Sequence, residues 1–140
     1  LEQILALAPV IPVIVLDRVE DAVPLAEALV AGGLPVLEVT LRSDAAIKAI
    51  EAIARSVPGA VVGAGTVVDP TQVFRVRDAG ARFIVSPGTY PTLTEAVQAS
   101  GIPFLPGAAT PSEVMDLLTR GFRYQKLFPA EVVGGQAMLK

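Results

Sequence analysis

The stretch Val10-Ile11-Pro12-Val13-Ile14-Val15-Leu16 is a continuous apolar run, rich in β-branched residues. Such a run is typical of a strand that is buried on both faces, as in a parallel sheet covered by helices. Residues 20–31 follow with apolar side chains at helical spacing, and Gly32-Gly33 marks the end of that helix. The sequence therefore begins with a βα unit, after a short helical segment at residues 1–8.

The same unit of strand, loop, helix and glycine recurs along the whole chain. Strand starts are separated by roughly 20 to 26 residues, the length of a βα unit in a parallel α/β fold. The expected strands are residues 10–16, 36–42, 61–67, 83–88, 104–107 and 124–130. The expected helix starts are Ser43, Asp69-Pro70 and the capping box Thr110-Pro111-Ser112-Glu113, and the expected stops are Gly33, Gly80, Gly101 and Gly121.

Two α/β architectures fit this alternation, a doubly wound sheet and a (β/α)8 TIM barrel. A doubly wound sheet usually has a glycine-rich phosphate loop after its first strand, but Asp17-Arg18-Val19-Glu20 stands there. Gly63-Ala64-Gly65-Thr66 matches only part of such a loop. The barrel is therefore favoured, and a closed one needs eight strands and roughly 200 residues or more. We expect residues 1–140 to be one barrel domain with about six βα units, truncated before strands seven and eight.

Composition excludes several classes of function. There is no cysteine and no histidine, which excludes disulfides, thiol nucleophiles, serine-histidine triads and most zinc sites. The net charge is −3 and the basic residues are dispersed, so nucleic-acid binding is not expected. No apolar run approaches the length of a membrane span, and residues 1–3 lack the basic leader of a secretory signal.

Lys126 is the most informative polar residue, because it stands in an expected buried strand. The chain has three lysines; Lys48 lies in an amphipathic helical pattern and Lys140 is the last residue. A lysine desolvated by apolar neighbours becomes a nucleophilic amine that attacks carbonyl substrates to form a Schiff base. The alternative is that Lys126 lies at a strand end and its ammonium reaches water.

Polar residues on other strands are expected to face Lys126. Side chains alternate along a strand, so residues two apart share a face. The residues that share a face are Glu38, Thr40 and Arg42 in the strand 36–42, Ala64 and Thr66 in the strand 61–67, and Tyr124, Lys126 and Phe128 in the strand 124–130. A carboxylate such as Glu38 can shuttle protons, while the Arg42 guanidinium and the Thr66 hydroxyl can hold a substrate carboxylate. The alternative is structural: Glu38 and Arg42 form an ion pair, and Thr66 caps a loop.

These residues lie in motifs that resemble one enzyme family. The motifs are Leu37-Glu38-Val39-Thr40-Leu41-Arg42, Val62-Gly63-Ala64-Gly65-Thr66-Val67, Val85-Ser86-Pro87-Gly88, Thr110-Pro111-Ser112-Glu113 and Lys126-Leu127-Phe128-Pro129-Ala130-Glu131. In this order and spacing they resemble the 2-keto-3-deoxy-6-phosphogluconate (KDPG) aldolases, class I aldolases of the Entner–Doudoroff pathway. The resemblance covers essentially the whole chain.

The resemblance implies a cytoplasmic homotrimer of (β/α)8 barrels that reversibly cleaves KDPG, a 2-keto acid, to pyruvate and glyceraldehyde 3-phosphate without a metal or other cofactor. It assigns the Schiff base to Lys126 and the general acid/base role to Glu38. Arg42 and Thr66 match the binders of the pyruvate carboxylate, and Pro87 and Phe128 match residues that line the pocket. Relatives in the family also cleave 4-hydroxy-2-oxoglutarate or the galactonate analogue. The phosphate-binding loops of strands seven and eight have no match here.

Two other readings remain open at this point. The chain could be a non-catalytic, truncated aldolase domain, which predicts no imine with pyruvate. It could also be a different lysine-dependent barrel enzyme with pyridoxal phosphate on Lys126, which predicts visible absorbance of the purified protein.

Overall fold

The computed structural model describes residues 1–140 as alternating parallel strands and helices. The strands are β1 (Val13–Ile14), β2 (Val36–Thr40), β3 (Val61–Gly65), β4 (Ile84–Val85), β5 (Phe104–Leu105), β6 (Gly107–Ala108) and β7 (Lys126–Leu127). The helices are α1 (Glu2–Leu5), α2 (Ala22–Ala31), α3 (Ala46–Ser56), α4 (Pro70–Asp78), α5 (Pro91–Ser100) and α6 (Pro111–Thr119), with 3-10 turns η1 (Val19–Asp21) and η2 (Gly135–Leu139).

All strand pairs are parallel, in the orders β1-β2-β3-β4-β5 and β6-β7. β5 and β6 are separated only by Pro106, so they are two segments of one strand position that pair with different neighbours. The chain therefore has six βα strand positions, each beside the next in sequence order. This order confirms the expected α/β fold with six units of a barrel.

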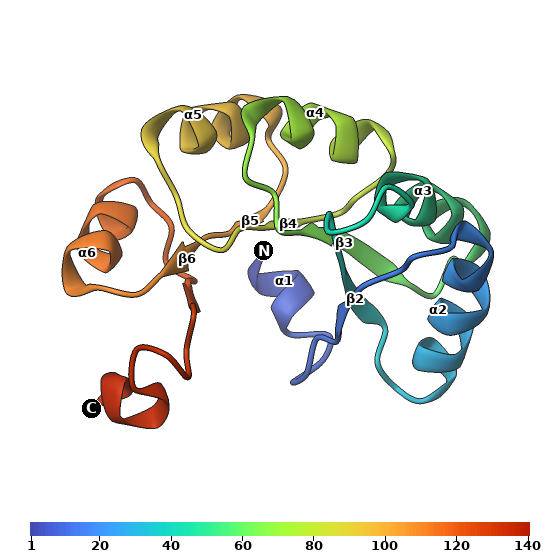
Figure 1. The fold of residues 1–140 in the computed structure, drawn as a ribbon, viewed down its shortest axis with the longest axis horizontal. Coiled ribbons are helices and arrows are strands. Elements are labelled where there is room, and N and C mark those ends of the chain that lie inside the picture. Colours follow the sequence, from blue (N-terminus) through green and yellow to red (C-terminus); the bar gives the residue numbers. More distant parts are fainter.

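The strands form a curved wall with two differently covered faces (Figure 1). Helices α2 to α6 follow one another along the convex face, and α1 lies on the concave face. The main core, which includes Leu37, Val39, Val62 and Ile84, packs between strands and outer helices. On the concave face Val36, Phe83 and Val85 form a smaller cluster with Leu1 and Ile4 at α1. The short first helix thus covers the inner face of the wall.

Two expected buried strands are shorter and more exposed than predicted. In the stretch 10–16 only Val13–Ile14 form a strand, and Val10, Val13 and Val15 are 58, 52 and 48% exposed. In the stretch 124–130 only Lys126–Leu127 form a strand, and both residues are half-buried. The reason is shared: β1 and β7 each pair on one side only, so nothing covers their outer edges.

Most of the predicted helix boundaries are confirmed. Asp69 and Thr110 both form capping boxes, and the glycines Gly33, Gly80, Gly101 and Gly121 all adopt positive φ. Ser43 is not the N-cap of α3, a position taken by Ala45; its hydroxyl donates a hydrogen bond to the Leu16 carbonyl instead. Residues Gly135–Leu139 form the 3-10 turn η2. None of the helices has the length and apolar character required to span a membrane.

Candidate active site

Lys126 and Glu38 meet although 88 residues separate them in the sequence. The Lys126 Nζ lies 3.4 Å from the Glu38 Oε1, within reach of a hydrogen bond. The Glu38 side chain is 6% exposed and that of Lys126 26% exposed. β7 is an edge strand, but its lysine side chain reaches an almost fully buried carboxylate of β2. Lys126 thus lies at a strand end and is partly exposed, as in the alternative, but its ammonium also contacts Glu38.

The main chain around Lys126 is held by β6. Lys126 N donates to the Pro106 carbonyl at 2.8 Å, Phe128 N donates to the Ala108 carbonyl at 3.1 Å, and Gly107 pairs with Lys126 in register. A Cβ on Gly107 would collide with the Pro87 carbonyl group, so only glycine allows β6 to approach the chain that leaves β4. This close approach sets the position of the strand that carries Lys126.

Phe128 lies beside the amine, as the alternation along the strand predicts. The Lys126 Nζ is 5.2 Å from the centroid of the Phe128 ring, a distance at which a cation interacts favourably with the ring face. Tyr124, expected on the same face, is near the first helix, where hydrogen bonding with the Glu2 carboxylate raises the pKa of its phenol.

Glu38 extends from β2 across the neighbouring strand β3. In register Glu38 pairs with Gly63, and Thr40 pairs with Gly65. The Glu38 carboxylate leans over Gly65, where an added Cβ would be 2.7 Å from Cγ and 2.8 Å from Cδ. Thr40 has a structural role. Its buried hydroxyl donates a hydrogen bond to the Ile14 carbonyl at 2.9 Å and so links β2 to β1.

Arg42, Thr66 and Pro87 each follow the carboxyl end of a strand, β2, β3 and β4 respectively. In barrel enzymes this end of the strands carries the chemistry. Arg42 is exposed in the turn after β2, outside the strand alternation that was expected to place it beside Glu38. It forms no ion pair, and the carboxylate of Glu38 pairs with Lys126, so the structural Glu38–Arg42 ion pair is wrong.

Thr66 has an unusual backbone. Its φ is 57°, and it is the only residue other than glycine with a positive φ. The left-handed region costs a β-branched residue on the order of 1–3 kcal/mol, and such strain concentrates at functional sites. Asp69, not Thr66, caps the following helix α4. Thr66 therefore follows β3 in a backbone conformation that glycine would adopt more easily.

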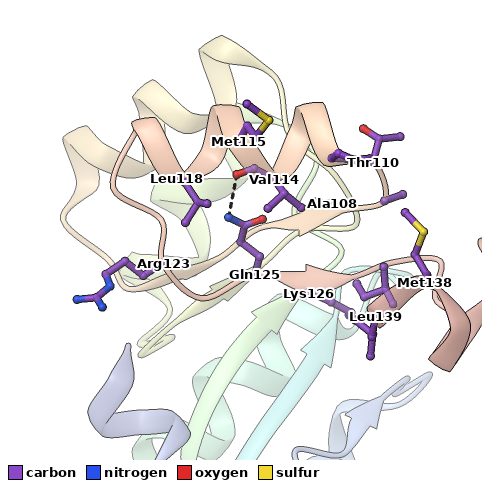
Figure 2. A pocket seen from close by; sticks show the side chains of 13 residues that line it. Ala108, Thr110, Val114, Met115, Leu118, Arg123, Gln125, Lys126, Met138 and Leu139 are labelled. Atoms are coloured by element: carbon purple, nitrogen blue, oxygen red, sulfur yellow. Dashed lines mark hydrogen bonds between the residues drawn. The ribbon is translucent and has the colours of Figure 1, made fainter.

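A cavity of about 580 Å³ lies beside β7, between α6 and η2 (Figure 2). Its lining is mostly apolar, with Val114, Met115 and Leu118 from α6, and Gln125 donates across it to the Val114 carbonyl at 3.2 Å. Lys126 contributes to the wall, but Glu38, Arg42 and Thr66 do not. This cavity is therefore distinct from the place where Lys126 meets Glu38. The chain has no group of three or more acidic side chains that could hold a metal ion.

The sequence patterns did not indicate Gly65 and Gly107 as site residues. Both are buried and both would collide with a neighbour if they had a Cβ. A signal was present for Gly65: it and Gly63 alternate on β3, so two successive positions on one face of that strand have no side chain. A bare face on a buried strand indicates that another group lies against it.

The whole chain, residues 1–140, matches the family model described as KDPG and KHG aldolase. It is 51% identical over 139 residues to the KHG/KDPG aldolase of Escherichia coli K12, covering 99% of this chain and 65% of that protein. It is 48% identical over 140 residues to the 2-dehydro-3-deoxy-phosphogluconate aldolase of Zymomonas mobilis, covering 100% of this chain and 67% of that one.

A solved structure agrees with these relatives. The KDPG aldolase of Legionella pneumophila, which holds pyruvate captured at low pH as a covalent carbinolamine intermediate, superposes with a TM-score of 0.93 and 52% identity. The match covers 97% of this chain and 66% of that one. This chain thus spans about two thirds of the length of the proteins it matches. By sequence and by fold, it belongs to the KDPG and KHG aldolase family.

Proposed function

We propose that this chain supports a class I aldolase reaction, the reversible cleavage of KDPG to pyruvate and glyceraldehyde 3-phosphate through a Schiff base on Lys126. The contact between the Lys126 Nζ and the Glu38 Oε1, at 3.4 Å, is the observation that carries the proposal. It joins an amine to a proton-transferring group inside the fold, the pair that imine chemistry requires.

In the cleavage direction the Lys126 amine adds to the C2 carbonyl of the substrate to form a carbinolamine, which loses water to form a protonated imine. Glu38 then accepts the proton of the C4 hydroxyl while the C3–C4 bond breaks. The aldehyde leaves, and the bonding electrons pass to the imine nitrogen as an enamine. Glu38 then returns the proton to C3 of the enamine, and addition of water releases pyruvate and restores the amine.

The other residues are proposed to bind the substrate. Arg42 has a guanidinium without an ionic partner and Thr66 has a strained backbone, both at the carboxyl ends of adjacent strands. We assign them to the carboxylate of the 2-keto acid, and Pro87 and Phe128 to the walls around the reacting carbon. 4-Hydroxy-2-oxoglutarate or the galactonate analogue remains the alternative substrate, and a cytoplasmic homotrimer in the Entner–Doudoroff pathway the proposed context.

The test uses pyruvate, because it needs no phosphate site. Purified protein is treated with borohydride in the presence of pyruvate and then digested for mass spectrometry. We expect a reduced pyruvate adduct on Lys126 and on neither Lys48 nor Lys140. Absence of any adduct contradicts the proposal and leaves the non-catalytic reading. A visible absorbance band before pyruvate is added would favour pyridoxal phosphate instead.

Arg42→Ala is expected to weaken capture of pyruvate without removing the amine. A lost charged hydrogen bond is worth ~1.5–3 kcal/mol, so the pyruvate concentration for half-maximal trapping should rise about tenfold to a hundredfold. The measurement is adduct yield against pyruvate concentration. Arg55→Ala, at the exposed end of α3, is the matched control and should leave the curve unchanged. An unchanged curve for Arg42→Ala would show that another group holds the carboxylate.

A further inference from the structure

Gly65 occupies the space beneath the Glu38 side chain. An ideal Cβ built on Gly65 would be 2.7 Å from the Glu38 Cγ, 2.8 Å from Cδ, and closer still to Oε1. Real Cβ atoms essentially never approach other heavy atoms so closely, so either the glutamate or the strand has to shift. The oxygen in closest conflict is the one that contacts the Lys126 Nζ.

The obstacle at Gly65 is steric and does not come from the backbone. Gly65 is not among the residues with positive φ, so an L-amino acid fits its backbone conformation. The three atoms nearest to an added Cβ all belong to the Glu38 side chain. The missing side chain at Gly65 therefore leaves space for the side chain of Glu38.

The register explains why Glu38 needs this space. Glu38 is level with Gly63, while Gly65 is level with Thr40, two residues nearer the carboxyl ends of the strands. To lie over Gly65 the carboxylate leans toward the end of the wall where Arg42 and Thr66 stand. A residue with a Cβ at position 65 would push the carboxylate out of this direction.

We infer that Gly65 is a positioning residue, whose missing side chain lets the Glu38 carboxylate lie across β3 and reach the Lys126 amine. The inference rests on the proposed function, because it assigns to Gly65 the placement of the proposed acid/base. It predicts that Gly65→Ala harms the proton-transfer step and spares the nucleophile. Misplacement of a reacting group by about 1 Å costs on the order of 10²-fold in rate.

The experiment separates the two steps with pyruvate. Adduct yield after borohydride reports the Lys126 amine, and deuterium exchange of the pyruvate methyl group in D₂O, followed by proton NMR, reports proton transfer through the enamine. For Gly65→Ala we expect the adduct to form and the exchange rate to fall about 10²-fold. In a Glu38→Gln background the same change should cause less than about a twofold further loss, as expected when one residue acts only through the other. A wild-type exchange rate in Gly65→Ala, or an equal loss in both backgrounds, overturns the inference.

Gly63→Ala is the matched control on the same strand. The three atoms nearest to its Cβ would all belong to the ring of buried Phe83, so we expect it to lower the melting temperature but keep the ratio of exchange to adduct unchanged. If Gly65→Ala does not fold, melting temperatures still test the inference. Glu38→Ala removes the three atoms nearest to the added Cβ, so Gly65→Ala should be tolerated in that background. Failure of Glu38→Ala to relieve the defect overturns the inference. A wild-type protein without any adduct instead contradicts the proposed function, a distinct outcome.

Discussion

Replacing Lys126 by methionine is expected to abolish the pyruvate adduct and to lower methyl exchange by on the order of 10⁴-fold or more, the scale seen when a nucleophile that acts as a unit with its partners is removed. No other lysine can substitute, because Lys48 lies on α3 and Lys140 is residue 140, both exposed. Adduct mass spectrometry and methyl exchange measure both losses.

Lys126→Met also leaves the buried Glu38 carboxylate without its cation, so a loss of folding has to be separated from a loss of chemistry. Lys126→Arg serves this purpose, because a guanidinium keeps the charge beside Glu38 but stays protonated and forms no imine. It should retain the wild-type circular dichroism spectrum and show no adduct. Lys48→Met is the control for lysine replacement and should behave as wild type. Adduct formation in either Lys126 variant would reject the assignment of the nucleophile.

Glu38→Gln is expected to slow methyl exchange by about 10²- to 10⁴-fold, the range that a positioned general acid/base contributes. The amide keeps the size of the side chain and can still contact the Lys126 amine, but it does not accept a proton. Adduct formation should persist at a reduced rate, since the nucleophile is intact. Time-resolved borohydride trapping and proton NMR in D₂O measure the two steps separately.

The control for Glu38→Gln is Glu51→Gln, which removes an exposed carboxylate from α3. It should leave exchange and adduct formation unchanged. If Glu38→Gln exchanges the methyl group at the wild-type rate, Glu38 is not the base, and its contact with Lys126 is structural. Because the change is isosteric, we expect little change in melting temperature, so a large unfolding effect would also argue against a purely catalytic role.

Local sequence signals were reliable where a short segment decides its own conformation. Asp69-Pro70 and the Thr110 box begin helices because a side-chain oxygen and a fixed proline φ act within one turn. Ser43 fails as a cap because the Leu16 carbonyl, which its hydroxyl binds, belongs to a distant segment. The two stretches expected to be fully buried are only partly so, since burial of a strand depends on both of its neighbours and β1 and β7 each have one.

The site residues show the same difference between local signals and signals that depend on distant segments. Alternation along β7 correctly placed Phe128 beside the Lys126 amine. It misplaced Arg42, because β2 ends at Thr40 and alternation has no meaning in the turn that follows. The sequence did not predict Gly65 and Gly107 as site residues. A glycine that leaves space for another group can be recognised only when the position of that group is known.

The sequence by itself determined the order and type of the elements, and it indicated a lysine, a glutamate and an arginine as the residues of the site. The tertiary structure alone decided that Lys126 and Glu38, 88 residues apart, meet at 3.4 Å and that Glu38 does not pair with Arg42. The physical reason is range: turns and caps are settled within a few residues, whereas the direction of a buried side chain depends on which atoms of neighbouring strands leave it space.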